Sequence, residues 1–449
     1  MKNSVKKEKT LLIKNGIVVT LGEKNKVLYN HAVLCEGRHI KQIAPQKEFR
    51  GRYDKVIDAA GQVVLPGFIN AHMHFYSTMA RGLGKAMPSK NFQEVLEHLW
   101  WRLDKKLTLD DCYYSALAPL IEAVRHGTTT LIDHHASPFA VAGSLDLLAK
   151  AVKQSGLRAS LCYELSDRDG EKVAQEGIDE NTAFIKRCQR ENDGQLRALF
   201  GLHASFTIGD KTLEKAVDVA RLLDAGFHVH TAEAKSDQEF NQKNFGMRVV
   251  ERFHKFGILG AKSLAAHCVH VNDREIDLLA QTQTAVAHNP QSNMNNAVGV
   301  ADIIKMTEKG VLVGLGTDAM TVNMLEELRS ALWAQHLSHD NPSCGFMEAM
   351  STLAFNNAAI ANRYWDGKLG VLKEGAFADI VLIEYHPPTP FDENTFLGHL
   401  CFGLSQSRAD TTIASGQVLM ENKKLKIDID EEEIAAKSLE LSKKLWERF

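Results

Sequence analysis

Between residues 66 and 365, apolar runs of strand length alternate with amphipathic stretches long enough to form helices. Strand–helix repetition of this kind is typical of a parallel sheet. Eight repeats over about 300 residues fit a (β/α)8 barrel, which usually takes ~250 residues. We therefore predict an α/β protein built on a (β/α)8 TIM barrel, with a doubly wound open sheet as the alternative. The eight runs are residues 63–74, 127–133, 159–164, 196–203, 227–230, 263–267, 284–288 and 311–317.

Both ends of the chain depart from this alternation of strand-like and helical segments. Residues 10–65 contain short strand-like segments punctuated by glycines (10–14, 17–20, 32–36, 39–44 and 56–58). Strand-like segments return after residue 370, and residues 431–449 predict a charged helix. We expect the two ends to pair into one small β-sandwich that is discontinuous in sequence. The predicted boundaries are 1–65 and 366–449 for the β-sandwich parts, and 66–365 for the barrel.

Composition excludes several classes of partner. The net charge is −3 and the pI about 6.7, so the chain has no basic field for nucleic acid or an anionic membrane. No apolar run reaches the ~18 residues of a membrane span, and no signal peptide is predicted. The seven cysteines are scattered and odd in number, which argues against a disulfide framework. We expect a cytoplasmic protein.

Polar side chains of metal-binding type follow the apolar runs. In TIM-barrel enzymes the active site lies at the carboxyl ends of the strands, where these residues would meet. Each has a simpler interpretation: a lone histidine is usually structural, Asp318 could cap the next helix, and His228 could belong to the core. Their convergence favours a metal site. In chain order they are His72 and His74, Asp133 with His134 and His135, Glu164, His203, His228 and His230 with Glu233, His267, His288 and Asp318.

One subset predicts a single metal centre. His72 and His74 are two residues apart on a strand, so their side chains share a face. Together with His230 and Asp318 they would hold one divalent ion with room for water, whose pKa such an ion lowers to near ~7. Glu233 would face away on a continuing strand, so we expect the strand to end near Thr231 and the loop to turn Glu233 back over the metal. The alternative for Glu233 is a solvated loop charge.

Several motifs resemble the amidohydrolase superfamily, and most closely its branch of adenosine, S-adenosylhomocysteine and chlorotriazine-type deaminases and hydrolases. The resemblance covers essentially the whole chain. It rests on PGFINAHMH (66–74), HTAE (230–233), AHCVH (266–270), HNPQSN (288–293), GTD (316–318) and LGVLKEGAFAD (369–379). The segments 133–137 and 293–299 resemble the SsnA-type subgroup of aminohydrolases, while 318–323 and 75–82 depart from the related deaminases and leave the substrate open.

The resemblance implies roles for individual residues. His72, His74, His230 and Asp318 would be the metal ligands, and Glu233 would shuttle protons. His267 would orient the attacking water or polarise the bond under attack, and Asp318 would also accept a proton. His203, His134 and Asn293 would bind substrate. Binuclear members carry a carboxylated lysine on the fourth strand; residues 196–203 contain no lysine, so one divalent ion is expected, zinc first, with iron or manganese as alternatives.

The expected reaction is hydrolytic deamination of an amino-substituted purine- or pyrimidine-like heterocycle, a small-molecule substrate. The alternative within enzymes is hydrolysis of a cyclic amide, or displacement of another group such as chloride, on the same metal. Two further alternatives are a barrel kept only as a non-enzymatic scaffold and a histidine-rich jelly roll of the cupin type. The resemblance to this family also implies a homodimer.

Overall fold

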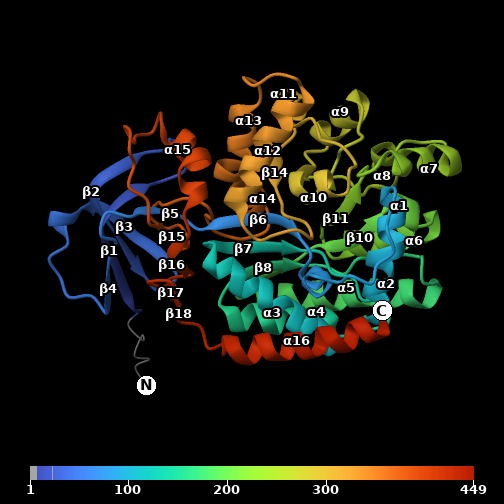
Figure 1. Cartoon of the computed structure of the whole chain (residues 1–449), viewed down its shortest axis with the longest axis horizontal. Helices are drawn as coiled ribbons and strands as arrows, with labels where there is room; N and C mark the ends of the chain where they lie inside the picture. The colour runs from blue at the N-terminus through green and yellow to red at the C-terminus, as the bar shows by residue number, and fades with distance from the viewer. Residues whose placement is uncertain (1–7, 23) are drawn as a thin grey trace.

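The computed structural model describes residues 8–22 and 24–449. It contains a parallel barrel and a separate sheet, to which both ends of the chain contribute (Figure 1). The predicted fold class, a (β/α)8 barrel with a small discontinuous β-domain, is confirmed.

Parallel strands in eight positions form the described barrel. Four pair in the order β6-β7-β8-β9 and five in the order β10-β11-β12-β13-β14, and β9 and β10 share one position because only Leu199 separates them. Their bounds are β6 Phe68–Met73, β7 Thr128–Asp133, β8 Arg158–Leu161, β9 Leu196–Ala198, β10 Phe200–Ala204, β11 Phe227–Thr231, β12 Leu264–His267, β13 Ala285–His288 and β14 Val313–Leu315.

Backbone contacts close the barrel at its two seams. A parallel bridge joins Met73, at the end of β6, to Asp318, just beyond β14. The amide of Thr317 also donates to the carbonyl oxygen of His72 at 2.9 Å. At the other seam, a parallel bridge joins Leu165 to Leu202 in β10. Closure therefore brings the ends of the first and eighth strands together, which a sheet with open edges would not do.

Helices surround the barrel and connect its strands (Figure 1). Those between the first and last barrel strands are α1 Phe92–Val95, α2 Trp101–Leu103, α3 Leu109–Arg125, α4 Ser144–Ser155, α5 Glu171–Glu191, α6 Asp210–Leu222, α7 Lys235–Phe245, α8 Val249–Phe256, α9 Asp273–Gln281, α10 Pro290–Asn295 and α11 Ile303–Glu308. After β14 come α12 Met324–Ser338, α13 Phe346–Ser351, α14 Asn357–Ala361, α15 Phe396–Phe402 and α16 Glu431–Arg448.

The second sheet joins the two ends of the chain, as predicted. Its strands follow the order β18-β17-β16-β15-β5-β1-β2-β3, with β4 paired to β1, so β5 and β15 are the strands at which the two ends meet. They are β1 Thr10–Val19, β2 Val27–Glu36, β3 His39–Pro45, β4 Lys55–Asp58, β5 Val63–Pro66, β15 Ile380–Ile383, β16 Ala409–Ala414, β17 Gln417–Glu421 and β18 Lys424–Leu425.

The first apolar run does not form one barrel strand, and this expectation was wrong. Residues 63–74 divide into β5, in the terminal sheet, and β6, in the barrel. Gly67 lies between them. A Cβ atom there would come within 2.3 Å of the Thr129 side chain, so the chain can cross at this point only as glycine. The predicted domain boundaries stay predictions, and this crossing lies beside the first of them.

Two other boundaries differ from the sequence prediction. Segments 10–14 and 17–20 form one strand, β1, in which Asn15 takes a left-handed backbone (φ 60°) and makes an irregularity. Helix α4 starts at Ser144 and not at residue 140. Its first turn is capped from α5, because the Glu180 carboxylate accepts from the amides of Gly143 and Leu145 at 2.9 Å.

Among the described residues, no helix combines the length and apolarity that crossing a membrane requires.

Candidate metal centre

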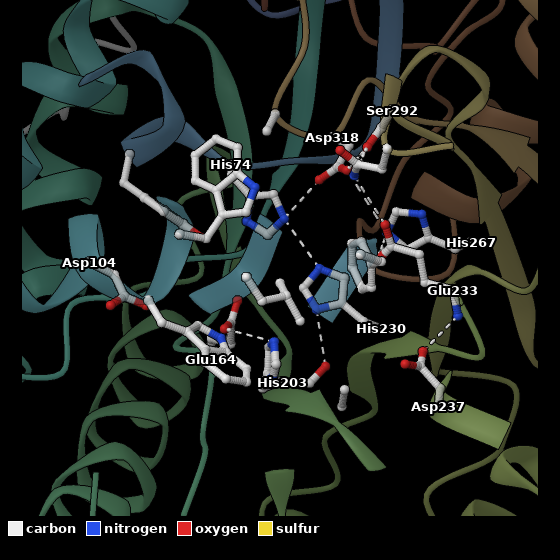
Figure 2. Close-up of a pocket in the computed structure, with 18 of the residues that line it drawn as sticks. His74, Asp104, Glu164, His203, His230, Glu233, Asp237, His267, Ser292 and Asp318 are labelled. Atoms are coloured by element: carbon white, nitrogen blue, oxygen red, sulfur yellow. Dashed lines mark hydrogen bonds and ion pairs between the residues drawn. The ribbon is translucent and has the colours of Figure 1, made fainter. Parts of the chain in front are cut away.

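Four side chains from three barrel positions converge at the carboxyl end of the barrel. His72 and His74 come from the end of β6, His230 from β11, and Asp318 from the turn after β14. One ligand atom from each lies within 4.8 Å of every other. Oδ1 of Asp318 is 3.0 Å from Nε2 of His74 and 3.4 Å from Nε2 of His72. Figure 2 shows His74, His230 and Asp318 pointing toward one another.

The second nitrogen of each ring is already bonded, which leaves Nε2 for a ligand. Metal-binding histidines commonly donate their other N–H in this way, which fixes the ring and its tautomer. Nδ1 of His74 donates to the carbonyl oxygen of His134, and Nδ1 of His230 donates to that of His203 at 3.0 Å. Nδ1 of His72 is 2.9 Å from Nε2 of His228, a contact in which His72 is the donor when its own Nε2 binds a metal.

This donor set fits a divalent cation. Nε2 of His74 and Nε2 of His230 are 3.2 Å apart, and Nε2 of His72 is buried with no hydrogen-bond partner. Atoms around a tetrahedral zinc with bonds of ~2.0–2.1 Å lie ~3.3 Å apart. Three imidazole lone pairs and one carboxylate held at this spacing repel one another unless a cation lies between them. The arrangement therefore supports the predicted ligands, His72, His74, His230 and Asp318.

Glu233 stands over this cluster because the chain turns sharply after β11. The strand ends at Thr231, as expected, and Ala232 takes a left-handed backbone (φ 47°). Asp237 holds the turn, since its Oδ2 accepts from the Glu233 amide at 2.9 Å. Burial, followed by the negative charge of Asp318, raises the pKa of Glu233 well above its ordinary value. This environment therefore favours the protonated form of Glu233 more than water does.

His267 lies between the two carboxylates. Its Nε2 is 3.5 Å from Oε2 of Glu233 and 4.0 Å from Oδ2 of Asp318. This nitrogen makes no hydrogen bond. Nδ1 of His267 donates to Oδ1 of Asn293 at 2.8 Å. Asp318 also accepts from the hydroxyl of Ser292 through Oδ2. His267 and Asp318 both adopt left-handed backbones (φ 73° and 51°), a strain that clusters at functional sites.

A cavity opens in front of these residues. Its empty volume is about 620 Å³, counting the solvent-open space at its mouth. Aromatic side chains form part of its wall, among them Tyr76, Trp100, Trp101 and Phe206, and the polar groups described above line the rest. A flat ring could stack on the aromatic wall while its edge faces the metal ligands.

The residues predicted to contact substrate occupy different depths. His203 lines the cavity, whereas Asn293 and His134 are fully buried behind its wall, Asn293 against His267 and His134 against Glu164. Asp318 does not cap the following helix, because Asn323 is the N-cap of α12. His228, which could have been an ordinary core residue, is the hydrogen-bond partner of His72.

Sequence reasoning left several cavity residues without a role. Glu164 was the polar end of the third run, so its position gave the signal, but its partners lie on other strands. Ser292 lies within the motif at 288–293. The ion pair between Asp104, which lines the cavity, and Arg168 gave no signal. Asp104 begins a short 3-10 helix and Arg168 lies in a turn 64 positions later.

Comparison with known proteins places the chain among metal-dependent hydrolases. The model of the Amidohydrolase family matches residues 63–419. The 5-methylthioadenosine/S-adenosylhomocysteine deaminase of Dictyoglomus thermophilum is 34% identical over 423 residues, covering 91% of this chain and 93% of that protein. The protein of the same name from Syntrophomonas wolfei is 32% identical over 443 residues, covering 97% and 99%.

Solved structures show the same fold. An adenosine deaminase from Xanthomonas campestris with bound zinc has a TM-score of 0.85 and 21% identity, covering 97% of this chain and 98% of that one. Atrazine chlorohydrolase from Arthrobacter aurescens, complexed with zinc, has a TM-score of 0.81 and 24% identity, covering 96% and 100%.

Proposed function

The chain belongs to the amidohydrolase family and is a hydrolytic enzyme acting on carbon–nitrogen bonds, and we propose that it removes the amino group of a purine- or pyrimidine-like heterocycle as ammonia. The observation that carries this proposal is the position of Glu233 and His267 beside the four candidate ligands. Deamination needs a group that protonates the ring and a group that holds the attacking water.

His72, His74, His230 and Asp318 would hold the divalent ion. When bound, the ion supplies a water whose pKa falls to near ~7. Glu233 gives its proton to the ring nitrogen beside the amino-bearing carbon, which draws electron density away from that carbon. Nε2 of His267, held by Asn293, orients the water, and Oδ2 of Asp318 accepts its remaining proton. As the water adds, its first proton replaces the one that Glu233 gave to the ring nitrogen. Asp318 passes the second proton to the amino group, which leaves as ammonia, so a carbonyl replaces it.

The cavity supports a flat, aminated substrate. Its aromatic wall provides stacking surfaces for a heterocycle, and its buried polar end would orient the ring edge. The relatives from D. thermophilum and S. wolfei are named for 5-methylthioadenosine and S-adenosylhomocysteine, so adenosine-like compounds are the first to test.

We propose zinc as the resident ion, since the candidate set of three histidines and one aspartate suits zinc, with iron and manganese as the alternatives.

A cytoplasmic location is supported by seven free thiols, because free thiols are typical of a reducing compartment. The homodimer remains a proposal based on family habit. Size-exclusion chromatography with light scattering would test it.

An ammonia-release screen tests the reaction. Zinc-replete protein is incubated with adenosine, 5'-methylthioadenosine, S-adenosylhomocysteine, guanine, pterins and modified nucleosides, and ammonia is measured together with the loss of each substrate. We expect ammonia in equal amount to the substrate consumed for at least one compound. Ring opening or chloride release in its place, from matched cyclic amides or chlorinated rings, would assign the site to another bond.

A further inference from the structure

A second buried glutamate lines the cavity on the side opposite Glu233. Glu164, which follows β8, is only 6% exposed. One ligand atom each of His74, His230 and Glu164 lies within 4.8 Å of the others. Figure 2 shows Glu164 and Glu233 on opposite sides of His230. Glu164 therefore borders the place where the proposed reaction occurs, but that reaction gives it no role.

Two imidazoles hold this carboxylate in place. Its Oε2 is 3.2 Å from Nδ1 of His134, and its Oε1 is 3.6 Å from Nε2 of His203. Each carboxylate oxygen has two lone pairs, so a contact with one imidazole leaves it able to accept from another donor. Arg168 pairs with Asp104, and no lysine or arginine is among the described residues that line the cavity. The remaining acceptor capacity is therefore open to a substrate.

The surroundings push the pKa values of the two glutamates in opposite directions. Burial, followed by the charge of Asp318, raises the pKa of Glu233. Burial also opposes the ionisation of Glu164, but its imidazole neighbours, His203 first, and the charge of Arg168 outweigh burial and lower the pKa of that carboxyl. Two carboxyl groups separated in this way take different roles. Glu233 suits a proton donor, and Glu164 suits a hydrogen-bond acceptor.

An aminated ring has two ring atoms beside the carbon that carries its amino group. In the proposed reaction, one of them is the nitrogen that receives the proton of Glu233. Because Glu164 lies on the opposite side, the other ring atom faces an ionised carboxylate. A ring N–H at this position would donate to Glu164, whereas the lone pair of a bare nitrogen would be repelled and a carbon would leave the carboxylate without a partner.

We infer that Glu164 selects heterocycles in which the amino-bearing carbon lies between a bare ring nitrogen and a ring N–H. This edge occurs in cyclic amides such as guanine, pterin and isocytosine. Adenine and cytosine lack it, because the second ring atom beside their amino-bearing carbon is a carbon. The inference rests on the proposed reaction and narrows its substrate class, away from the adenosine compounds for which the relatives are named.

Equilibrium dialysis with three purines tests this inference on zinc-loaded Glu233→Gln protein, which should bind a substrate without converting it. Guanine, 2-aminopurine and 1-methylguanine all carry the amino group on the same carbon, but only guanine has an N–H beside that carbon. We expect guanine to bind about 10-fold more tightly, or better, than either of the other two, because only guanine gives Glu164 a donor.

A second substitution assigns this preference to Glu164. Adding Glu164→Gln should reduce the ratio of guanine to 2-aminopurine to below about 3-fold, because an amide also donates to a bare nitrogen. Adding Glu180→Gln is the matched control, since it removes a largely buried carboxylate that caps α4 and does not line the cavity, and it should keep the ratio.

Equal affinities for guanine and 2-aminopurine in the Glu233→Gln protein would overturn the inference, as would a ratio that survives Glu164→Gln. If Glu164→Gln prevents folding, the ratio in the Glu233→Gln protein decides alone. The inference and the proposed reaction fail separately. Preferred binding of guanine without ammonia release removes only the reaction, and ammonia release from adenosine with equal binding of guanine and 2-aminopurine removes only the inference.

Discussion

Hydrogen bonds behind the candidate ligands determine which nitrogen each histidine can offer. One chain of contacts runs from Nδ1 of His72 to Nε2 of His228 at 2.9 Å and from Nδ1 of His228 to the sulfur of Cys162 at 3.6 Å, and that sulfur donates to the carbonyl oxygen of Asp133 at 3.5 Å. This chain keeps Nε2 of His72 free for a metal. His228 therefore acts through His72, as a positioning residue.

Replacing His228 should weaken metal binding without removing a ligand. We expect His228→Ala to raise the Kd for zinc by roughly 10–100-fold, because His72 loses the acceptor that fixes its ring. Competition with a chromophoric chelator measures this Kd. His288→Ala is the control, since His288 is equally buried but bonds none of the candidate ligands, and its zinc affinity should stay at the wild-type value. Equal affinities in both variants would remove His228 from this role.

Glu233 is the residue on which the reaction depends most. Glu233→Gln keeps the shape of the side chain but cannot shuttle a proton. We expect kcat to fall by about 10²–10⁴-fold or more while zinc content stays unchanged. The readouts are ammonia release and metal analysis on the same sample, with Glu239→Gln, an exposed position on α7, as the control. Near-normal turnover on a confirmed substrate would exclude Glu233 as the proton carrier.

A buried ion pair joins the terminal sheet to the barrel. Arg158 begins β8, and its Nη1 pairs with Oδ2 of Asp379, just before β15. Both side chains are almost fully buried. The same guanidinium donates to the hydroxyl of Ser415 at 2.7 Å and stacks over Phe377. The two sheets are therefore tied by one fully enclosed cation.

Removing its partner should destabilise the whole chain. We expect Asp379→Ala to lower the free energy of unfolding by about 3–5 kcal/mol, because Arg158 is left buried and unpaired. Urea denaturation measures the change. Glu384→Ala is the matched control: it breaks an exposed pair with Lys423 on the same sheet and should leave the midpoint almost unchanged. Similar midpoints for the two variants would show that the buried pair does not hold the sheets together.

Elements were predictable where a local pattern determines them. Each of the eight apolar runs includes a barrel strand, and in seven of them it is not joined to a strand of the terminal sheet. Helix α16 lies where the sequence placed it, because alternation and helical periodicity are local properties. Prediction failed where the bounds of an element depend on a residue far away in the sequence. The division of residues 63–74 depends on Thr129 crowding Gly67, and the start of α4 depends on Glu180.

The candidate ligands were predictable at the scale of the molecule for a different reason. A closed barrel brings all strand ends to one rim, so the polar residues that follow the apolar runs had to meet. Their depth could not be predicted. Whether His134, His203 or Asn293 reaches the cavity depends on side-chain packing between strands far apart in sequence. The position of α16 against the rest of the chain could not be predicted either, because it depends on a contact between distant residues. Trp446 donates from Nε1 to the carbonyl oxygen of Met79 at 2.7 Å.

Metal should stabilise the folded chain as a whole, since the candidate ligands come together only when the barrel closes. Zinc at about 1,000 times its Kd should add ~4 kcal/mol to the free energy of unfolding. We therefore expect chelation to lower the Tm and abolish ammonia release, and zinc to restore both. Calorimetry before and after chelation measures the shift. An identical Tm for the metal-free and zinc-loaded protein would contradict a structural link between the four side chains and the ion.

Anomalous X-ray diffraction at the zinc edge, from crystals grown with zinc, tests the central claim most directly. The result expected is a strong peak ~2.0–2.2 Å from Nε2 of His72, His74 and His230 and from Oδ1 of Asp318. A map with no peak among these four atoms, in crystals that contain zinc elsewhere, would contradict the claim that they bind the ion.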